Sequence, residues 1–270
     1  MKYKSFVYPY LIWMVLLVII PFLFMALLSF SKSTGLSFDS LEFSLENVKK
    51  ISETVYYKAI LNSLLYGGIA TIICLLIGYP VAYVLAFSKF KYKTLALVLI
   101  IVPTWSNMLL RIIAWEKLFL PNSILNSIGI SLDLIGTPLA VIIGMVSIYL
   151  PFMIFPIYTV LEKIDTSLIE ASSDLGLTPF KTFLKVTLPL STSGIISGII
   201  MTFLPSATAF ALPARLSGGK LQLIGNIIET QFKTSFNYNF GSLISLVVVI
   251  VILIMLSIIY RVDSKGETLL

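Results

Sequence analysis

The chain has 270 residues, of which 58% are hydrophobic and 12% charged, and its mean hydropathy is +1.00. No soluble domain has a core large enough for that much apolar surface, so the composition excludes a soluble globular fold and predicts a membrane protein. The net charge of +6 would suggest nucleic acid as a partner of a soluble protein. In a membrane protein, lysines concentrate in cytoplasmic loops instead, and we expect no nucleic-acid partner.

Long charge-free runs recur along the chain, and each supplies the ~20 apolar residues that a spanning helix needs. No linker, repeat or shift in composition divides the chain, so we expect one all-α transmembrane domain over residues 1–270. The first run follows Lys2 and Lys4, but it is too long for a signal peptide and lacks a small-residue cleavage site, so it should remain as a span. The six predicted spans lie at about residues 8–31, 59–87, 94–116, 138–161, 187–212 and 240–260.

The short loops predict the orientation. Lys89, Lys91 and Lys93 share a tight turn without acidic residues, which the positive-inside rule places in the cytoplasm. Two crossings separate this turn from Lys2 and Lys4, so the N-terminus should be cytoplasmic. The same count places the C-terminus and the loop 163–189 in the cytoplasm.

Prolines recur within or at the ends of the runs, where each removes a backbone hydrogen bond and bends or breaks a helix. Such bends are tolerated where neighbouring helices or a water-filled cavity satisfy the freed carbonyls, which favours a bundle with a central path. In the fifth run, Gly194 and Gly198 allow a close helix approach, either within this chain, which we favour, or against a partner. After this run, Leu221, Ile224, Ile228 and Phe232 predict a half-buried external helix that acts as a cap or as a gate.

A short polar segment separates the fourth run from the fifth. Asp165 or Thr166 can cap a helix, Gly176 can end it in the left-handed conformation, and Thr178-Pro179 can open the next helix. The segment therefore predicts a helix-turn-helix that lies along the cytoplasmic surface.

This segment resembles the EAA loop of ABC importer permeases, in which Glu-Ala-Ala is followed at fixed distances by Gly, by Ile and by a Leu-Pro pair. The matching residues are Glu170, Ala171, Gly176, Leu188 and Pro189. Ser172 and Val186 depart from the pattern but keep a small and a β-branched side chain. The stretches 102–112, 141–158 and 217–232 are similar to the B-type permeases of spermidine/putrescine importers, and this likeness covers roughly residues 55–260.

The resemblance implies a six-helix type I ABC importer permease with a cytoplasmic coupling helix. It also implies a second, C-type permease, two ATPase subunits that bind ATP and Mg²⁺, and an extracytoplasmic binding protein. Because the chain has no GxxxxGK[ST] pattern, we expect that it cannot hold ATP phosphates by itself. It also has no His, no metal-ligand cluster and no nucleophile with a base beside it, so we expect no catalysis, cofactor or metal in this chain itself. The residues implied to dock on the ATPase are Glu170 as the charged anchor, Ala171 and Ser172 as small contacts, Gly176 at the turn, and Leu168, Ile169, Leu175 and Leu177 as apolar contacts.

A polyamine carries several ammonium groups, so its path should offer carboxylates, carbonyl oxygens or aromatic faces. No Asp or Glu lies deep in any predicted span, which suggests a path of low affinity. Arg111 lies near the outer part of the third span, where Glu116 could pair with it; a cation-repelling gate is the alternative. The candidate lining residues are Trp105, Asn107, Arg111, Trp115, Tyr149, Phe152, Phe203 and Phe210.

Other functions are weighed against this interpretation. A related ABC importer for another small solute would share parts of the same stretches. A secondary transporter would need buried ionisable relays, and the chain has no His. The single cysteine, Cys74, lies within the second run and is expected to pack rather than react, and an enzyme would need a nucleophile with a base beside it.

Overall fold

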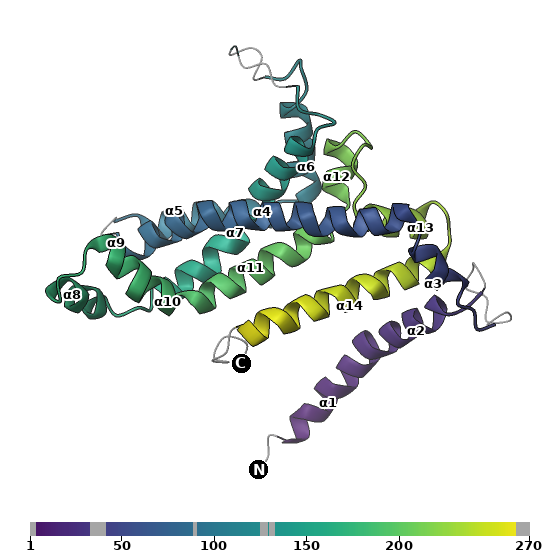
Figure 1. Ribbon diagram of the computed structural model, residues 1–270, viewed down its shortest axis with the longest axis horizontal. Helices are drawn as coiled ribbons and strands as arrows, with labels where there is room; N and C mark the ends of the chain where they lie inside the picture. The colour runs from purple at the N-terminus through teal and green to yellow at the C-terminus, as the bar shows by residue number, and fades with distance from the viewer. Residues whose placement is uncertain (1–3, 33–41, 89–90, 125–128, 130–132, 263–270) are drawn as a thin grey trace. The chain divides into compact units, whose positions relative to one another are not determined.

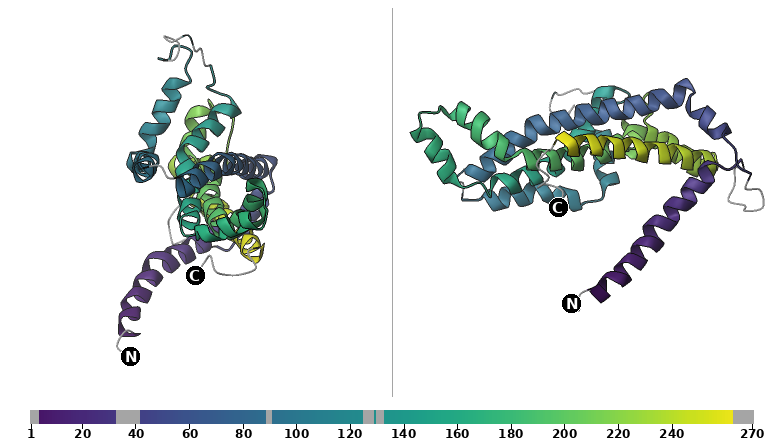
Figure 2. Two further views of the ribbon diagram at one scale, coloured as in Figure 1. Left: turned by 90° about the vertical axis from the view of Figure 1, so that its left-hand side faces the viewer. Right: turned by 60° about the horizontal axis from the view of Figure 1, so that its bottom comes forward.

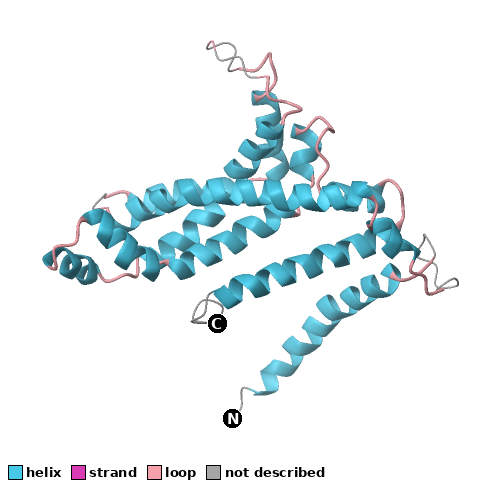
Figure 3. Cartoon of the chain, viewed as in Figure 1, coloured by secondary structure: helices cyan, strands magenta, loops and turns pink. Residues whose placement is uncertain are grey.

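The computed structural model describes residues 4–32, 42–88, 91–124, 129 and 133–262. These residues form helices joined by loops, with one isolated antiparallel bridge between Ser31 and Phe43, which confirms the predicted all-α fold (Figures 1 and 3). The elements in chain order are α1 (Lys4–Met14), the π-helical turn η1 (Val15–Ile19), α2 (Ile20–Ser29), α3 (Glu46–Ile51), α4 (Thr54–Phe87), α5 (Lys93–Trp105), α6 (Met108–Leu118), α7 (Pro138–Leu161), α8 (Thr166–Asp174), α9 (Pro179–Thr182), the π-helical turn η4 (Phe183–Thr187), α10 (Leu188–Leu190), α11 (Thr192–Ala207), α12 (Ala211–Leu216), α13 (Ile224–Lys233) and α14 (Tyr238–Val262).

The chain divides into two compact units, and α4 and α14 each pass from one unit into the other. The first unit comprises residues 1–61 and 224–254. Its core joins the start of α4 to α13 and α14 through Ala59, Ile224, Ile227, Phe240 and Ile244. The predicted external helix is therefore present and packed, but it begins at Ile224, so Leu221 precedes it.

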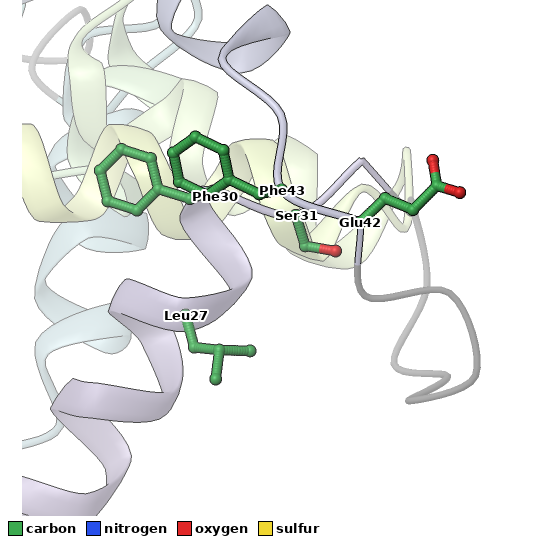
Figure 4. Close-up of a pocket in the computed structure, with 5 residues that line it drawn as sticks. All are labelled: Leu27, Phe30, Ser31, Glu42 and Phe43. Carbon is green, nitrogen blue, oxygen red and sulfur yellow. The ribbon is translucent and has the colours of Figure 1, made fainter.

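A cluster of buried hydrogen bonds lies at the end of α2 in the same unit. The carbonyl of Ser31 accepts hydrogen bonds from Nδ2 of Asn47 and from Nδ2 of Asn239, each at 3.3 Å. Beside it the rings of Phe30 and Phe43 stack with their centroids 5.9 Å apart. Figure 4 shows the neighbouring pocket, of about 430 Å³, in which the Glu42 side chain points away from the two rings.

The second unit comprises residues 62–223 and 255–270, and its core lies between α4, α7 and α11. Gly194 and Gly198 of α11 face α7: a Cβ at Gly194 would lie 3.0 Å from Ile157 Cα, and one at Gly198 would lie 3.1 Å from the Met153 carbonyl oxygen. The predicted close approach is thus confirmed, and it occurs within this chain. Cys74 is fully buried in the same core, as its packing role predicts.

Within the described part of the chain, four helices are long and apolar enough to cross a membrane, and the number rises to six if two sharply bent helix pairs each count as one span. The four are Tyr8–Ser29, Thr54–Phe87, Pro138–Leu161 and Tyr238–Ser257. They coincide with the first, second, fourth and sixth predicted spans to within a few residues. The bent pairs fall at the third and fifth.

The third predicted span, 94–116, is present as a bent pair of helices and not as one continuous helix. α5 and α6 meet at 95°. Ser106 is extended, and the Asn107 side chain accepts a hydrogen bond from the backbone N–H of Leu109 at 2.8 Å, so a new helix is capped inside the apolar run.

The fifth span was predicted over 187–212 and is also different. The helical arm begins at Pro179, bends by 65° at Ser191 and ends at Ala207, before the separate short helix α12. An apolar run shows which residues lie in the bilayer, but it does not show where the helix axis turns.

Candidate coupling hairpin and translocation surface

The loop between α7 and α11 folds into a helical hairpin, formed by α8 and the arm Pro179–Leu190, at one end of the second unit (Figures 1 and 2). Asp165 caps α8 by accepting a hydrogen bond from the Ser167 N–H at 2.9 Å, and this bond lowers the pKa of the Asp165 carboxyl. Gly176 has φ +79°, the left-handed conformation that ends α8. Thr178 and Pro179 then open α9. Each of these local features was predicted from the sequence.

The hairpin has an exposed face and an internal one. Glu170, Ala171, Leu168 and Leu175 are exposed, and Leu175 keeps 82% of its side-chain surface accessible. Phe180, at the start of the second arm, is 70% exposed and was not among the predicted residues. Its position one residue after the helix-opening Thr178-Pro179 pair was the available signal.

Ser172 lies on the internal face. It is 4% exposed, and its hydroxyl lies 2.8 Å from the equally buried hydroxyl of Thr182. The expected role of Ser172 as a small contact on the docking face is therefore corrected: this side chain joins the two arms of the hairpin, because it lies on the side of α8 that faces α9.

The second arm of the hairpin packs against α4. The Phe183 ring meets the rings of Tyr79 and Tyr83 edge-on, with centroid distances of 5.6 and 5.9 Å. The Tyr79 hydroxyl lies 2.7 Å from the hydroxyl of Ser191, the residue at the bend between α10 and α11.

A second link joins the helices that lead into the hairpin. Oε1 of Glu162, at the end of α7, accepts a hydrogen bond from the Tyr158 hydroxyl and lies 3.4 Å from Nζ of Lys93 on α5. The bond from Tyr158, supported by the Lys93 ammonium, holds the pKa of the Glu162 carboxyl below its ordinary value. The predicted orientation depends on the lysine turn 89–93 and on Lys2 and Lys4. In that turn Lys91 is exposed, whereas Lys89, like Lys2, lies outside the described residues.

The predicted path residues separate into an exposed and a packed group. Trp105 is 83% exposed at the break between α5 and α6, next to the exposed Asn107. Phe152 of α7 is 40% exposed and lines a cavity of about 140 Å³ between α5, α7 and α11. Phe155 and Met201 line the same cavity; the spacing of Phe155, three residues after Phe152 on one helix, was a signal that the sequence analysis missed.

Tyr149 and Phe203 are only 4% and 7% exposed, and the Tyr149 hydroxyl donates to the carbonyl of Pro205 at 3.2 Å. Their assignment to the path is therefore corrected, because both side chains fill the core of this chain. Trp115 is half-buried, and its ring packs against the ring of Phe119 with the centroids 5.1 Å apart. Phe210 remains 44% exposed at the start of α12.

The expected pair between Arg111 and Glu116 is not formed. Oε2 of Glu116 instead binds Nη1 of Arg215 on α12 at 3.0 Å, across the α6–α12 contact. The Nε of Arg111 is buried without a hydrogen-bond partner among the described residues. On a helix, residues five apart do not face each other, whereas α12 brings a cation beside Glu116 from another part of the chain.

The family described as "Binding-protein-dependent transport system inner membrane component" matches residues 3–265. The chain belongs to this family. The permease is 37% identical over 258 residues to the spermidine/putrescine transport system permease protein PotB of Haemophilus influenzae, covering 93% of this chain and 90% of that protein. It is 38% identical over 256 residues to PotB of Escherichia coli, covering 92% and 93%.

More distant proteins share the fold. The inner membrane ABC transporter permease protein YdcU of Escherichia coli is 27% identical over 242 residues, covering 83% of this chain and 77% of YdcU. A chain from the crystal structure of a bacterial alginate ABC importer superposes with a TM-score of 0.79 at 12% identity, covering 98% of the permease and 95% of that chain. A chain of the MetNI methionine ABC transporter superposes at 0.61 with 17% identity, covering 78% and 95%. The permease therefore has the ABC importer permease fold that its EAA-like loop predicted.

Proposed function

We propose that the permease forms one half of the translocation path of an ATP-driven importer of polyamines, spermidine and putrescine. The observation that carries this proposal is the identity of 37–38% with two PotB proteins over at least nine-tenths of both chains, against 27% with YdcU. Whole-length likeness includes the stretches that surround the path as well as the EAA-like loop, which by itself identifies only the transporter class.

The assembly that we propose contains a second, C-type permease, two ATPase subunits and an extracytoplasmic binding protein. The description of the family names a binding protein as part of the system, and a related solved transporter was crystallised with its periplasmic protein. ATP and Mg²⁺ would be bound by the ATPase subunits. Both termini and the hairpin would face the cytoplasm, as the acid-free lysine turn indicates.

The exposed face of the hairpin would dock on an ATPase subunit. Glu170 would supply a charged anchor, Ala171 permits close approach, and Leu168, Leu175 and Phe180 expose apolar surface that docking would remove from water. These large apolar side chains lie on a polar cytoplasmic segment, where lipid cannot cover all of them.

The path itself would be weakly attractive to cations. Trp105, Phe152 and Phe210 expose aromatic faces suited to cation–π contact, worth roughly 0.5–2 kcal/mol each. No Asp or Glu lies deep in the predicted spans. Selectivity would then reside in the binding protein, and the path could release its cargo.

Uptake tests the substrate. Cells that lack this chain should lose uptake of labelled spermidine, and the gene should restore it; excess unlabelled putrescine should compete, whereas an uncharged amino acid should not. Uptake that persists after the deletion would refute the polyamine assignment. Uptake that resists ATP depletion but collapses with a protonophore would favour an ion-gradient-driven transporter instead.

Co-purification tests the docking face. Glu170→Arg should abolish recovery of the ATPase with the permease. Asp133→Arg makes the same charge change on an exposed residue of the loop before α7, which should face the opposite side of the membrane, and should leave recovery unchanged. Equal recovery with both variants would show that the hairpin is not the docking site.

A further inference from the structure

The coupling hairpin is built as a stiff body. The Ser172–Thr182 hydroxyl contact joins its arms in a buried position, and the turn is closed by the bond from the Leu177 N–H to the Ser172 carbonyl at 3.1 Å. A force applied to the exposed face is therefore transmitted to the second arm, because these two contacts restrict movement of one arm relative to the other.

The second arm contacts the second span through the Phe183 side chain. Phe183 lies in the π-helical turn η4 and contacts both Tyr79 and Tyr83, which are one turn apart on α4. π-Helical turns inside α-helices are rare and occur often at functional positions. Motion of the arm along its axis must therefore displace these tyrosines or slide Phe183 across them.

The bend at the end of the arm is held by the same helix. The Ser191 hydroxyl lies 2.7 Å from the Tyr79 hydroxyl and 3.1 Å from the Leu188 carbonyl oxygen, so it can accept a hydrogen bond from Tyr79 while it donates one to Leu188. Ser191 is fully buried and Tyr79 is 7% exposed, so water does not readily replace this bond. Tyr79 thus fixes the bend residue between the hairpin arm and α11.

The far end of α11 also rests on α4. A Cβ at Gly67 would lie 3.0 Å from Cα of Ala207, the last residue of α11, and Oγ of Ser206, which donates to the Phe203 carbonyl at 2.9 Å, lies 3.4 Å from the Gly67 carbonyl oxygen. α4 therefore contacts α11 at both of its ends. A change in the bend at Ser191 cannot move α11 without also moving α4.

We propose that Tyr79 and Tyr83 form a joint through which the coupling hairpin moves the second span together with the fifth, with Tyr79 as the positioning residue of the bend at Ser191. This inference rests on the proposed function and adds to it an element that the resemblance did not imply, since the EAA-like loop connects the fourth and fifth spans. Neither tyrosine needs to touch the substrate or the ATPase.

The test uses the complete assembly in vesicles, with labelled spermidine taken up per ATP hydrolysed as the readout. Tyr79→Phe keeps the ring and removes only the hydroxyl, and Ser191→Ala removes its partner. Each should lower the ratio about three- to tenfold, the range expected for one buried hydrogen bond. The double variant should be no worse than either single variant, because both remove the same contact. Phe183→Leu, which keeps an apolar side chain, should lower the ratio as well.

The matched control is Tyr66→Phe, which removes a hydroxyl from the same helix at a half-buried position that is remote from the hairpin. Its ratio should equal that of the wild type. The amount of assembly recovered and its basal ATP hydrolysis show whether each variant is folded and docked. If spermidine uptake per ATP falls only as much as the amount of assembly recovered, the joint is overturned.

Failure of the proposed function and failure of the joint give different results. A wild-type assembly that moves no spermidine overturns the proposed function and the joint together. A wild-type assembly that is active, with Tyr79→Phe and Ser191→Ala unchanged or additive in the double variant, overturns the joint alone.

Discussion

Replacing Gly67 with alanine should leave the permease less stable than replacing its neighbour Gly68 with alanine. The two glycines are consecutive residues of α4, so both changes give the helix the same gain in propensity, about 1 kcal/mol. The surroundings differ: a Cβ at Gly67 would lie 3.0 Å from both Cα and N of Ala207, while a Cβ at Gly68 meets nothing within 4 Å. The difference between the two variants therefore isolates the helix contact.

The magnitude follows from what the new methyl group meets. Backbone atoms cannot rotate away as a side-chain tip does, so α4 and α11 must separate by a few tenths of an ångström. Overpacking of this kind typically costs about 1–3 kcal/mol, which should be the difference in the free energy of unfolding between Gly67→Ala and Gly68→Ala. Because the propensity terms cancel, the sign of the difference does not depend on their size in a membrane environment.

The assay is reversible unfolding of the purified permease in mixed micelles, followed by the loss of helical circular dichroism as a denaturing detergent is added. Gly68→Ala should unfold at or above the wild-type midpoint, and Gly67→Ala should unfold clearly below Gly68→Ala. Equal midpoints for the two variants would show that α4 and α11 do not approach as closely as the structure places them.

The remaining predictions use the same unfolding assay. Gly194→Ala should behave like Gly67→Ala, because its Cβ would lie 3.0 Å from Ile157 Cα and from the Pro156 carbonyl oxygen; a neutral effect would contradict the α7–α11 packing. The lowered pKa of Glu162 means that its contribution is complete above the ordinary glutamate pKa, about 4.3, and is lost as the pH falls through the lower value in the folded protein. Glu162→Gln should therefore be less stable than the wild type at neutral pH, by less than about 1 kcal/mol because the pair with Lys93 is exposed, and the difference should vanish in acid; a difference independent of pH would exclude this carboxylate as its source. Glu116→Arg and Arg215→Glu should each destabilise by about 1 kcal/mol or less, and the double exchange should restore stability, whereas additive losses would show that the two side chains do not pair.

The helical hairpin of α8 and the arm Pro179–Leu190 was the part of the molecule that the sequence described best. Its ends are set by local chemistry: a carboxylate that can accept an N–H, a glycine that tolerates positive φ, and a proline that has no N–H to lose. Signals of this kind act over three or four residues and do not depend on the rest of the fold. The direction in which Ser172 points was not accessible in this way, because it is decided by Thr182 on the other arm.

The spans were predicted from the absence of charge, and that signal has a definite limit. It locates apolar residues along the sequence, and the prolines within the runs predict bends, but neither signal gives the direction of the helix axis or the residue at which it turns. The break before Asn107 depends on a single capping side chain inside an apolar run. The pairing of Glu116 with Arg215 joins residues 99 positions apart, and only the packing of α6 on α12 brings them together.

The separation of the predicted path residues bears on how a cation could cross. Tyr149 and Phe203 are both buried within this chain, which removes two aromatic side chains from any path, and Tyr149 belongs to the core of the second unit. The aromatic side chains that remain exposed, among them Trp105 and Phe152, lie on an open surface of this chain, and the cavity beside Phe152 holds only about 140 Å³. An extended polyamine would need more room than that cavity provides and a second wall to exclude lipid. In the proposed assembly the companion permease supplies that wall, and a joint that moves α4 with α11 would open and close the space between the two chains.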